Sequence, residues 1–184
     1  MKLIKQLLVA MLITLSLSAQ ADIDTALQNF RSENYLQAFQ EYKQLANRGN
    51  IQAQYSLGGY YQYAWGNVVS PNLKEAIKWY RLASSQWLDG GHWSACAMQE
   101  LSQMYQNGEG GLPKSYVVFY AIKTVISVAT DSDVLHDRIV SKKELSYIEQ
   151  KMSQSQIEEG KLLSNRLMKR GNFLATLDAY SNNI

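Results

Sequence analysis

The sequence predicts an all-α protein, a short α-solenoid (a right-handed superhelix) of antiparallel helix pairs with capping helices at its C-terminal end. Three observations predict this fold class. Apolar residues recur at the i, i+3, i+4 spacing of an amphipathic helix over most of the chain. Only 2 prolines occur among 184 residues, which argues against a loop-rich β-sandwich. Similar helical segments also return about every 40 residues, a period that is typical of stacked helix pairs.

The first segment, residues 1–21, has the pattern of a secretory signal peptide. Lys2 and Lys5 precede an apolar stretch, and small residues close the segment at Ala19-Gln20-Ala21. The apolar stretch is too short to cross ~30 Å of hydrocarbon comfortably. We therefore expect residues 1–21 to be removed on export, with an uncleaved N-terminal anchor as the alternative.

Charge and composition exclude several classes of function. The chain has 18 basic and 16 acidic residues, and Lys2 and Lys5 belong to the predicted signal peptide. The mature chain is then neutral, so its charge gives no reason to expect nucleic acid or an anionic membrane as a partner. The hydrophobic fraction of 46% is enough for a packed core. We expect no membrane span after cleavage.

The mature chain divides into helical repeats at 22–130 and a C-terminal region at 131–184, made of capping helices and a short tail. In the repeats, the periodicity predicts helices over 35–48, 51–63, 73–84, 93–106 and 115–130. In the C-terminal region it predicts helices over 134–151 and 154–170. The last helix is expected to begin at Ser153 or Ser155, and Ser155 and Glu158 have the spacing of a capping box.

Two pairs of segments carry the internal repetition. Residues 35–42 match residues 73–80 at a separation of 38, and residues 54–61 match residues 98–105 at a separation of 44. The difference of six indicates an insertion near 87–93, between the two helices of the second copy. Insertions in a solenoid lie on one face, which is often the binding face.

The order and spacing of these residues resemble the Sel-one-like repeat, a helix-pair relative of the tetratricopeptide repeat. The resemblance is carried by small residues, large aromatic or aliphatic residues and a glycine-rich loop, at Ala53, Gln54, Leu57, Gly58, Tyr61, Ala76, Trp79, Tyr80, Ala83, Ala97, Leu101, Met104, Tyr105, Gly108, Gly110 and Leu112. Residues 116–129 resemble a degenerate closing repeat, and residues 145–170 resemble the capping helices of bacterial members. Together with the signal peptide, the resemblance implies a protein of the Gram-negative periplasm, with an extracellular fate as the alternative.

The sequence departs from the family pattern at several positions. Trp87 stands where the family has a helix-ending glycine, and Ser102 where it has a glycine on the second helix. In the closing repeat, Phe119 replaces a small residue and Lys123 replaces a tyrosine. We therefore expect about two regular repeats and a third imperfect one.

No group of residues has the spacing of a catalytic or metal site. His92 and Cys96 lie four residues apart on one predicted helix face, but no acidic residue or third ligand accompanies them. His136 is typical of a solvated helix face. We therefore expect no enzyme, no metal and no cofactor. A single cysteine also excludes an intramolecular disulfide, and we expect Cys96 to be buried, with an intermolecular bridge as the alternative.

The candidate binding site consists of four aromatic residues at helix ends and in the insertion: Tyr63, Trp65, Trp87 and Trp93. Aromatic side chains at such places anchor partners because they offer a large contact area. Core filling is the alternative for these four. It is the expected role of the aromatic residues inside the helices, namely Tyr61, Trp79, Tyr80 and Tyr105.

The sequence thus predicts an exported, non-catalytic adaptor or scaffold of the bacterial envelope that binds a protein or peptide on an aromatic-rich repeat surface. We expect it to be a monomer or a weak homo-oligomer. One alternative is a secreted hydrolase of the β-lactam-binding repeat type, although those relatives have paired cysteines and this chain has one. The other alternative is a structural subunit that oligomerises through Cys96.

Overall fold

The computed structural model describes residues 5, 22–88, 91–129, 142–169 and 171–184, and in these the regular secondary structure is helical. A helical segment at 22–31 is followed by α2 (Tyr35–Asn47), α3 (Ile51–Tyr63), the 3₁₀ helix η1 (Trp65–Asn67), α4 (Leu73–Ser84), α5 (Gly91–Asn107), α6 (Tyr116–Ala129), α7 (Lys142–Glu149), α8 (Gln154–Leu167) and α9 (Phe173–Ser181). The predicted signal peptide at 1–21 lies outside the described residues, apart from Lys5. None of the described helices is both long and apolar enough to cross a bilayer.

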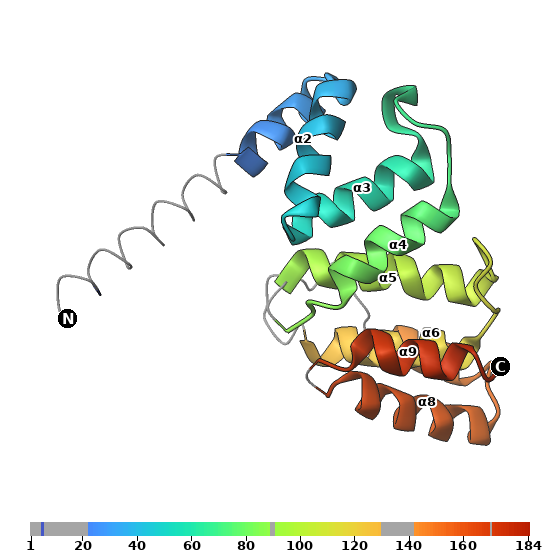
Figure 1. Cartoon of the computed structure of the whole chain (residues 1–184). Helices are drawn as coiled ribbons and strands as arrows, with labels where there is room; N and C mark the ends of the chain where they lie inside the picture. Colours follow the sequence, from blue (N-terminus) through green and yellow to red (C-terminus); the bar gives the residue numbers. More distant parts are fainter. Residues whose placement is uncertain (1–4, 6–21, 89–90, 130–141, 170) are drawn as a thin grey trace.

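The helices stack in chain order. Each one from α2 to α6 packs against the next, and α3 also packs against α5. Figure 1 shows α2 and α3 at one end, α4 and α5 in the middle, and α6, α8 and α9 at the other end. The all-α solenoid prediction is confirmed by this stacking of successive helix pairs.

The loop between α3 and α4 and the loop between α5 and α6 are closed by equivalent backbone hydrogen bonds. After α3, the N–H of Asn72 donates to the carbonyl of Tyr61 at 2.7 Å, and after α5 the N–H of Ser115 donates to the carbonyl of Tyr105 at 2.8 Å. The side chains of Asn72 and Ser115 also cap the next helix, each accepting from the backbone N–H three residues on. Such a cap satisfies one of the donors that a helix start leaves open.

Helices α3 and α4 approach closely because a glycine faces a tyrosine ring. A Cβ at Gly58 would overlap the ring of Tyr80, which is only 1% exposed. The Tyr80 hydroxyl donates to Oε1 of Gln62 at 2.7 Å, so the buried phenol keeps a hydrogen bond. Gly58 and Tyr80 of the repeat pattern therefore form a single contact between consecutive helices.

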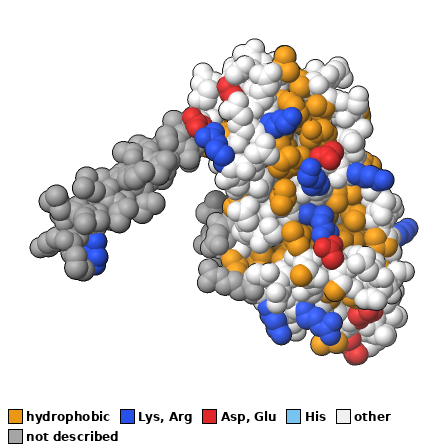
Figure 2. Space-filling view, viewed as in Figure 1, with side chains coloured by type: hydrophobic (Ala, Val, Ile, Leu, Met, Phe, Trp, Pro, Cys, Tyr) orange, Lys and Arg blue, Asp and Glu red, His pale blue; other side chains and the backbone are white. Residues whose placement is uncertain are grey.

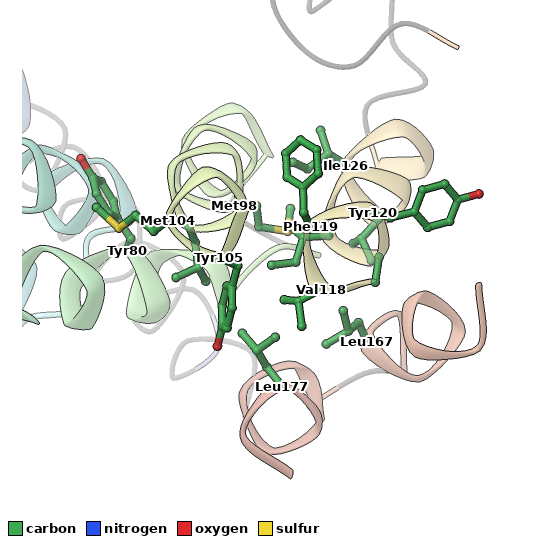
Figure 3. Packing of buried hydrophobic residues seen from close by; sticks show 14 of the residues in the cluster. Tyr80, Met98, Met104, Tyr105, Val118, Phe119, Tyr120, Ile126, Leu167 and Leu177 are labelled. Atoms are coloured by element: carbon green, nitrogen blue, oxygen red, sulfur yellow. The ribbon is translucent and has the colours of Figure 1, made fainter. Parts of the chain in front are cut away.

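In the described part of the chain, buried hydrophobic residues form two clusters. The N-terminal core cluster joins the segment 22–31, α2 and α3 with Trp79 of α4. The C-terminal core cluster joins α4 to α6 with α7, α8 and α9, and Figure 3 shows part of it. Trp79, Tyr80 and Tyr105 are buried as expected, whereas Tyr61 is half-buried.

The C-terminal region begins differently from the prediction. Ser153 caps α8, because its side chain accepts from the N–H of Gln156 at 3.2 Å while Oε1 of Gln156 accepts from the N–H of Ser153 at 2.9 Å. The capping box is therefore Ser153 with Gln156, and the prediction of Ser155 with Glu158 was wrong. Of the predicted helix at 134–151, the part at 134–141 lies outside the described residues, and α7 accounts for the rest.

The predicted short tail contains a further helix, α9. It buries Phe173 at 2% and Leu177 at 0% exposure, and Figure 3 shows Leu177 pointing toward the ring of Tyr105. Asp178 on the same helix forms an ion pair with Arg81 of α4. Residues 171–184 are therefore part of the packed fold, as is the helical segment at 22–31, which the periodicity also missed.

Candidate functional site

Tyr63 and Trp65 form a stacked aromatic pair at the C-terminal end of α3. The residue between them has a left-handed φ of 53°, so the helix ends there and the chain turns back. Trp65 then lies against Gly59, where a Cβ would overlap the indole ring. The rings of Tyr63 and Trp65 are 5.7 Å apart at an interplanar angle of 25°. Trp65 also contacts Phe30 and Tyr60 edge-on, so one side of the pair rests on the N-terminal core cluster.

Tyr63 is the exposed member of this pair. Its side chain is 52% exposed, whereas Trp65 is half-buried. The Tyr63 hydroxyl donates to Oε2 of Glu100 on α5 at 3.2 Å. Partial burial, and then the nearby Glu100 carboxylate, raise the pKa of Tyr63 to about 12. The phenol is therefore neutral at physiological pH and presents a flat apolar ring with a polar edge, a combination enriched at protein interfaces.

The other two candidate residues lie apart from this pair. Trp93 is on α5, and its ring centroid is 5.5 Å from that of Tyr55. Tyr55 precedes Tyr63 on α3 by eight residues, or ~12 Å at the helical rise of 1.5 Å per residue. Trp87 follows α4 and packs against the C-terminal core cluster. Both tryptophans are half-buried. The structure thus brings Tyr63 and Trp65 together, but it does not gather all four residues at one point.

The pair formed by His92 and Cys96 is near the start of α5. Cys96 Sγ lies 3.5 Å from Nε2 of His92, and Cys96 is half-buried instead of fully buried as expected. His136 lies outside the described residues. Among the residues that the structure describes, no group of three or more histidine, cysteine or acidic side chains is arranged to hold a metal.

A groove of about 560 Å³ is lined by residues of α2, α3 and α4. We call it the α2–α4 groove, and it is lined by Lys43, Ala46, Asn47, Gly49, Gln54, Tyr61, Glu75, Lys78, Trp79 and Leu82. Sequence reasoning missed it because these residues come from three helices and have no common spacing. Figure 2 shows hydrophobic side chains interspersed with lysine and arginine on the face that carries α4.

The α2–α4 groove combines apolar surface with cations. Leu82 is 37% exposed, and Trp79 beside it is 8% exposed. Lys78 lies 5.4 Å from the Trp79 ring centroid and pairs with Glu75 at 3.3 Å. The buried Nε1 of Trp79 has no hydrogen-bond partner among the described residues. Lys43 on the opposite wall is exposed, so two lysines and one already paired carboxylate give the groove a positive charge.

The chain is similar to known repeat proteins. Residues 51–86 and 97–118 match the model of the Sel1 repeat. Among solved structures, the chain resembles the crystal structure of a protective antigen present in uropathogenic Escherichia coli strains that displays an SLR fold, with a TM-score of 0.67 and 22% identity. The similarity covers 88% of this chain but only 32% of that protein. A comparison with curated proteins found no match.

The matched segments coincide with the stacked helices. The first spans α3 and α4, including the Gly58–Tyr80 contact, and the second spans most of α5 and the start of α6. The SLR-fold neighbour shares the overall arrangement of helices. Repeat pattern, contact and fold therefore agree: the chain is a helical repeat protein with two segments that match the Sel1 repeat, in an arrangement of helices similar to the SLR fold.

Proposed function

We propose that the protein is an exported, non-catalytic adaptor of the bacterial envelope, located in the periplasm, that binds a protein or peptide partner. Sel1 repeats are in general protein–protein interaction modules, and the SLR fold is typically a non-catalytic scaffold. The observation that carries the proposal is the exposed ring of Tyr63, which is held against Trp65 at the edge of the repeat stack. We expect the partner to be a polypeptide with an apolar side chain that covers the Tyr63 ring.

The proposed binding surface is preorganised. Stacking on Trp65 and the hydrogen bond to Glu100 hold the Tyr63 ring in one orientation before binding. A side chain that is already ordered loses little conformational entropy on binding, so more of the contact energy contributes to affinity. Trp93 and Trp87 are the proposed flanks of this surface, on α5 and in the turn after α4.

Replacing Tyr63 by alanine is expected to reduce partner capture at least about fivefold, because central aromatic anchors carry much of an interface's affinity. The assay uses the purified protein as bait for envelope extract, with mass spectrometry of the captured proteins. Tyr63 is the residue of choice because it is exposed, whereas Trp65 packs on the N-terminal core cluster. Tyr147→Ala is the matched control, since Tyr147 is 56% exposed and lies on α7. Equal capture by Tyr63→Ala and the unaltered protein would contradict the proposed surface.

Export is expected to remove residues 1–21 and leave Asp22 as the new N-terminus. The small residues Ala19 and Ala21 fit the positions that signal peptidase requires. The full chain is expressed in a Gram-negative host and the cells are fractionated. N-terminal sequencing of the recovered protein then identifies its first residue. Ala19→Arg with Ala21→Arg is expected to block processing. Recovery of the intact chain from the cytoplasm would contradict the proposed compartment.

A further inference from the structure

We propose that the α2–α4 groove binds an amphipathic helix of another protein, one that carries a carboxylate at the edge of its apolar face. The inference rests on the proposed function only in that the protein binds a polypeptide, because it assigns a different surface from that around Tyr63. One repeat further along the stack, a helix of this kind, α9, already contacts the equivalent residues.

The repeat places equivalent residues in the two grooves. The separation of 38 residues that relates α2 to α4 also relates Lys43 to Arg81. The separation of 44 that relates α3 to α5 relates Tyr61 to Tyr105. Lys43 and Tyr61 both line the α2–α4 groove. Their counterparts Arg81 and Tyr105 therefore mark the corresponding place one repeat further along the stack, which we call the second groove.

In the second groove, both Arg81 and Tyr105 contact α9. Arg81 forms an ion pair with Asp178, and the hydroxyls of Tyr105 and Ser181 are 3.0 Å apart. Leu177 is fully buried, and Figure 3 shows its side chain directed toward Tyr105. An amphipathic helix thus docks at this place with its apolar residues buried, and its acidic residue pairs with the cation on α4.

In the α2–α4 groove, the same kinds of groups face solvent. Lys43 is exposed and Tyr61 is half-buried, and no other described segment lines the groove besides α2, α3, α4 and the turn at Gly49. Leu82 adds apolar surface that is 37% exposed. Because the groove is lined by apolar side chains and by two lysines against one carboxylate, an acidic amphipathic helix is the complementary occupant.

The spacing on α9 defines what the occupant carries. Phe173 and Leu177 are apolar at i and i+4, and Asp178 follows at i+5. The predicted partner helix therefore has two large apolar residues one turn apart and an acidic residue next to the second. Helix-in-groove recognition generally uses anchors at such spacings.

A peptide with the sequence of α9 is the probe. A synthetic peptide of residues 172–184, bridged covalently between positions 175 and 179 to hold it helical, leaves the apolar face free because both positions are exposed. Binding of the labelled peptide to the full-length protein is measured by fluorescence anisotropy. The protein's own α9 is tethered in the second groove at high effective concentration, so the added peptide reports on the open α2–α4 groove.

Lys43→Glu is expected to weaken peptide binding about tenfold, because it replaces an attraction by a repulsion. A peptide with Asp178→Lys is expected to bind the Lys43→Glu protein better than the unaltered peptide does. Leu82→Asp is expected to abolish binding. The matched controls are Arg48→Glu and Leu36→Asp, which change exposed residues outside the groove and are expected to leave affinity unchanged.

Three results would overturn the inference. The first is the absence of peptide binding by a protein whose circular dichroism spectrum is intact. The second is binding that Arg81→Glu weakens and Lys43→Glu does not, since the peptide would then enter the second groove. The third is a concentration-dependent dimer that Lys43→Glu dissociates, since a second copy would then be the occupant. Capture of the envelope partner depends on Tyr63 instead, so either proposal can fail while the other stands.

Discussion

Replacing Tyr80 by alanine is expected to lower the free energy of unfolding by about 3–5 kcal/mol, the range for large buried rings whose removal leaves a cavity. Tyr80 is 1% exposed, and its ring lies against Gly58 of α3 and 5.8 Å from the ring of Tyr55. The contact between two consecutive helices of the stack depends on it. Urea unfolding followed by circular dichroism measures the change. Tyr147→Ala, at an exposed site, is expected to stay within about 0.5 kcal/mol of the unaltered protein.

Two further substitutions separate the contributions to this contact. Tyr80→Phe keeps the ring and removes only the hydrogen bond to Gln62, so a loss of about 1 kcal/mol is expected. Gly58→Ala is expected to be strongly destabilising in the unaltered protein, because its Cβ overlaps the Tyr80 ring. In the Tyr80→Ala protein, the same Gly58→Ala change fills part of the cavity and improves helix propensity by about 1 kcal/mol. An equal cost of Gly58→Ala in both proteins would show that Tyr80 is not the reason for the glycine.

Replacing Leu177 by alanine is expected to cost about 2–5 kcal/mol, because Leu177 is 0% exposed and joins α9 to the C-terminal core cluster. The expected loss is also local, since α9 is the last helix and lies at one end of the stack (Figure 1). Hydrogen exchange of residues 171–184, compared with that of α3 and α4, measures the local component.

Asp178→Ala is the matched control on the same helix. It removes the ion pair with Arg81, but the Asp178 side chain is 54% exposed, and exposed ion pairs contribute at most about 1 kcal/mol. If Leu177→Ala and Asp178→Ala had equal and small effects, the docking of α9 through its apolar face would be wrong.

The regular helices were predictable because their apolar spacing repeats. The predicted limits at 51–63 and 73–84 agree with α3 and α4. The helix α9 was not predicted because it has only nine residues and because it docks on residues such as Tyr105, which lies 76 positions before its hydroxyl partner Ser181. The half-buried state of Cys96 was likewise set by neighbours that the local Ala-Cys-Ala pattern does not show.

The candidate site was predictable in part. Tyr63 and Trp65 are two residues apart, so a single turn at the helix end brings their rings together. The positions of Trp87 and Trp93 depend instead on how α4 and α5 pack, and spacing gives no information on that. The α2–α4 groove has no sequence signature. The repeat separation of 38 residues, however, relates Lys43 to Arg81, and Arg81 pairs with Asp178. Once that pair is known, the separation indicates Lys43 as the equivalent cation of the α2–α4 groove.

The hydrogen bonds from Asn72 to Tyr61 and from Ser115 to Tyr105 affect which positions of the chain can change in sequence during evolution. Both bonds join main-chain atoms, so the point where each loop returns to the preceding helix is held by a contact that does not depend on which side chains stand at its two ends. The loops at 64–71 and 108–114 have little sequence in common, yet each is closed by a bond to the equivalent tyrosine of the preceding helix. Substitutions at loop positions other than the packed residues Trp65, Val68, Val69 and Leu112 can therefore change the loop surface while the closing bonds are kept, which allows such a protein to acquire new surfaces on an unchanged frame.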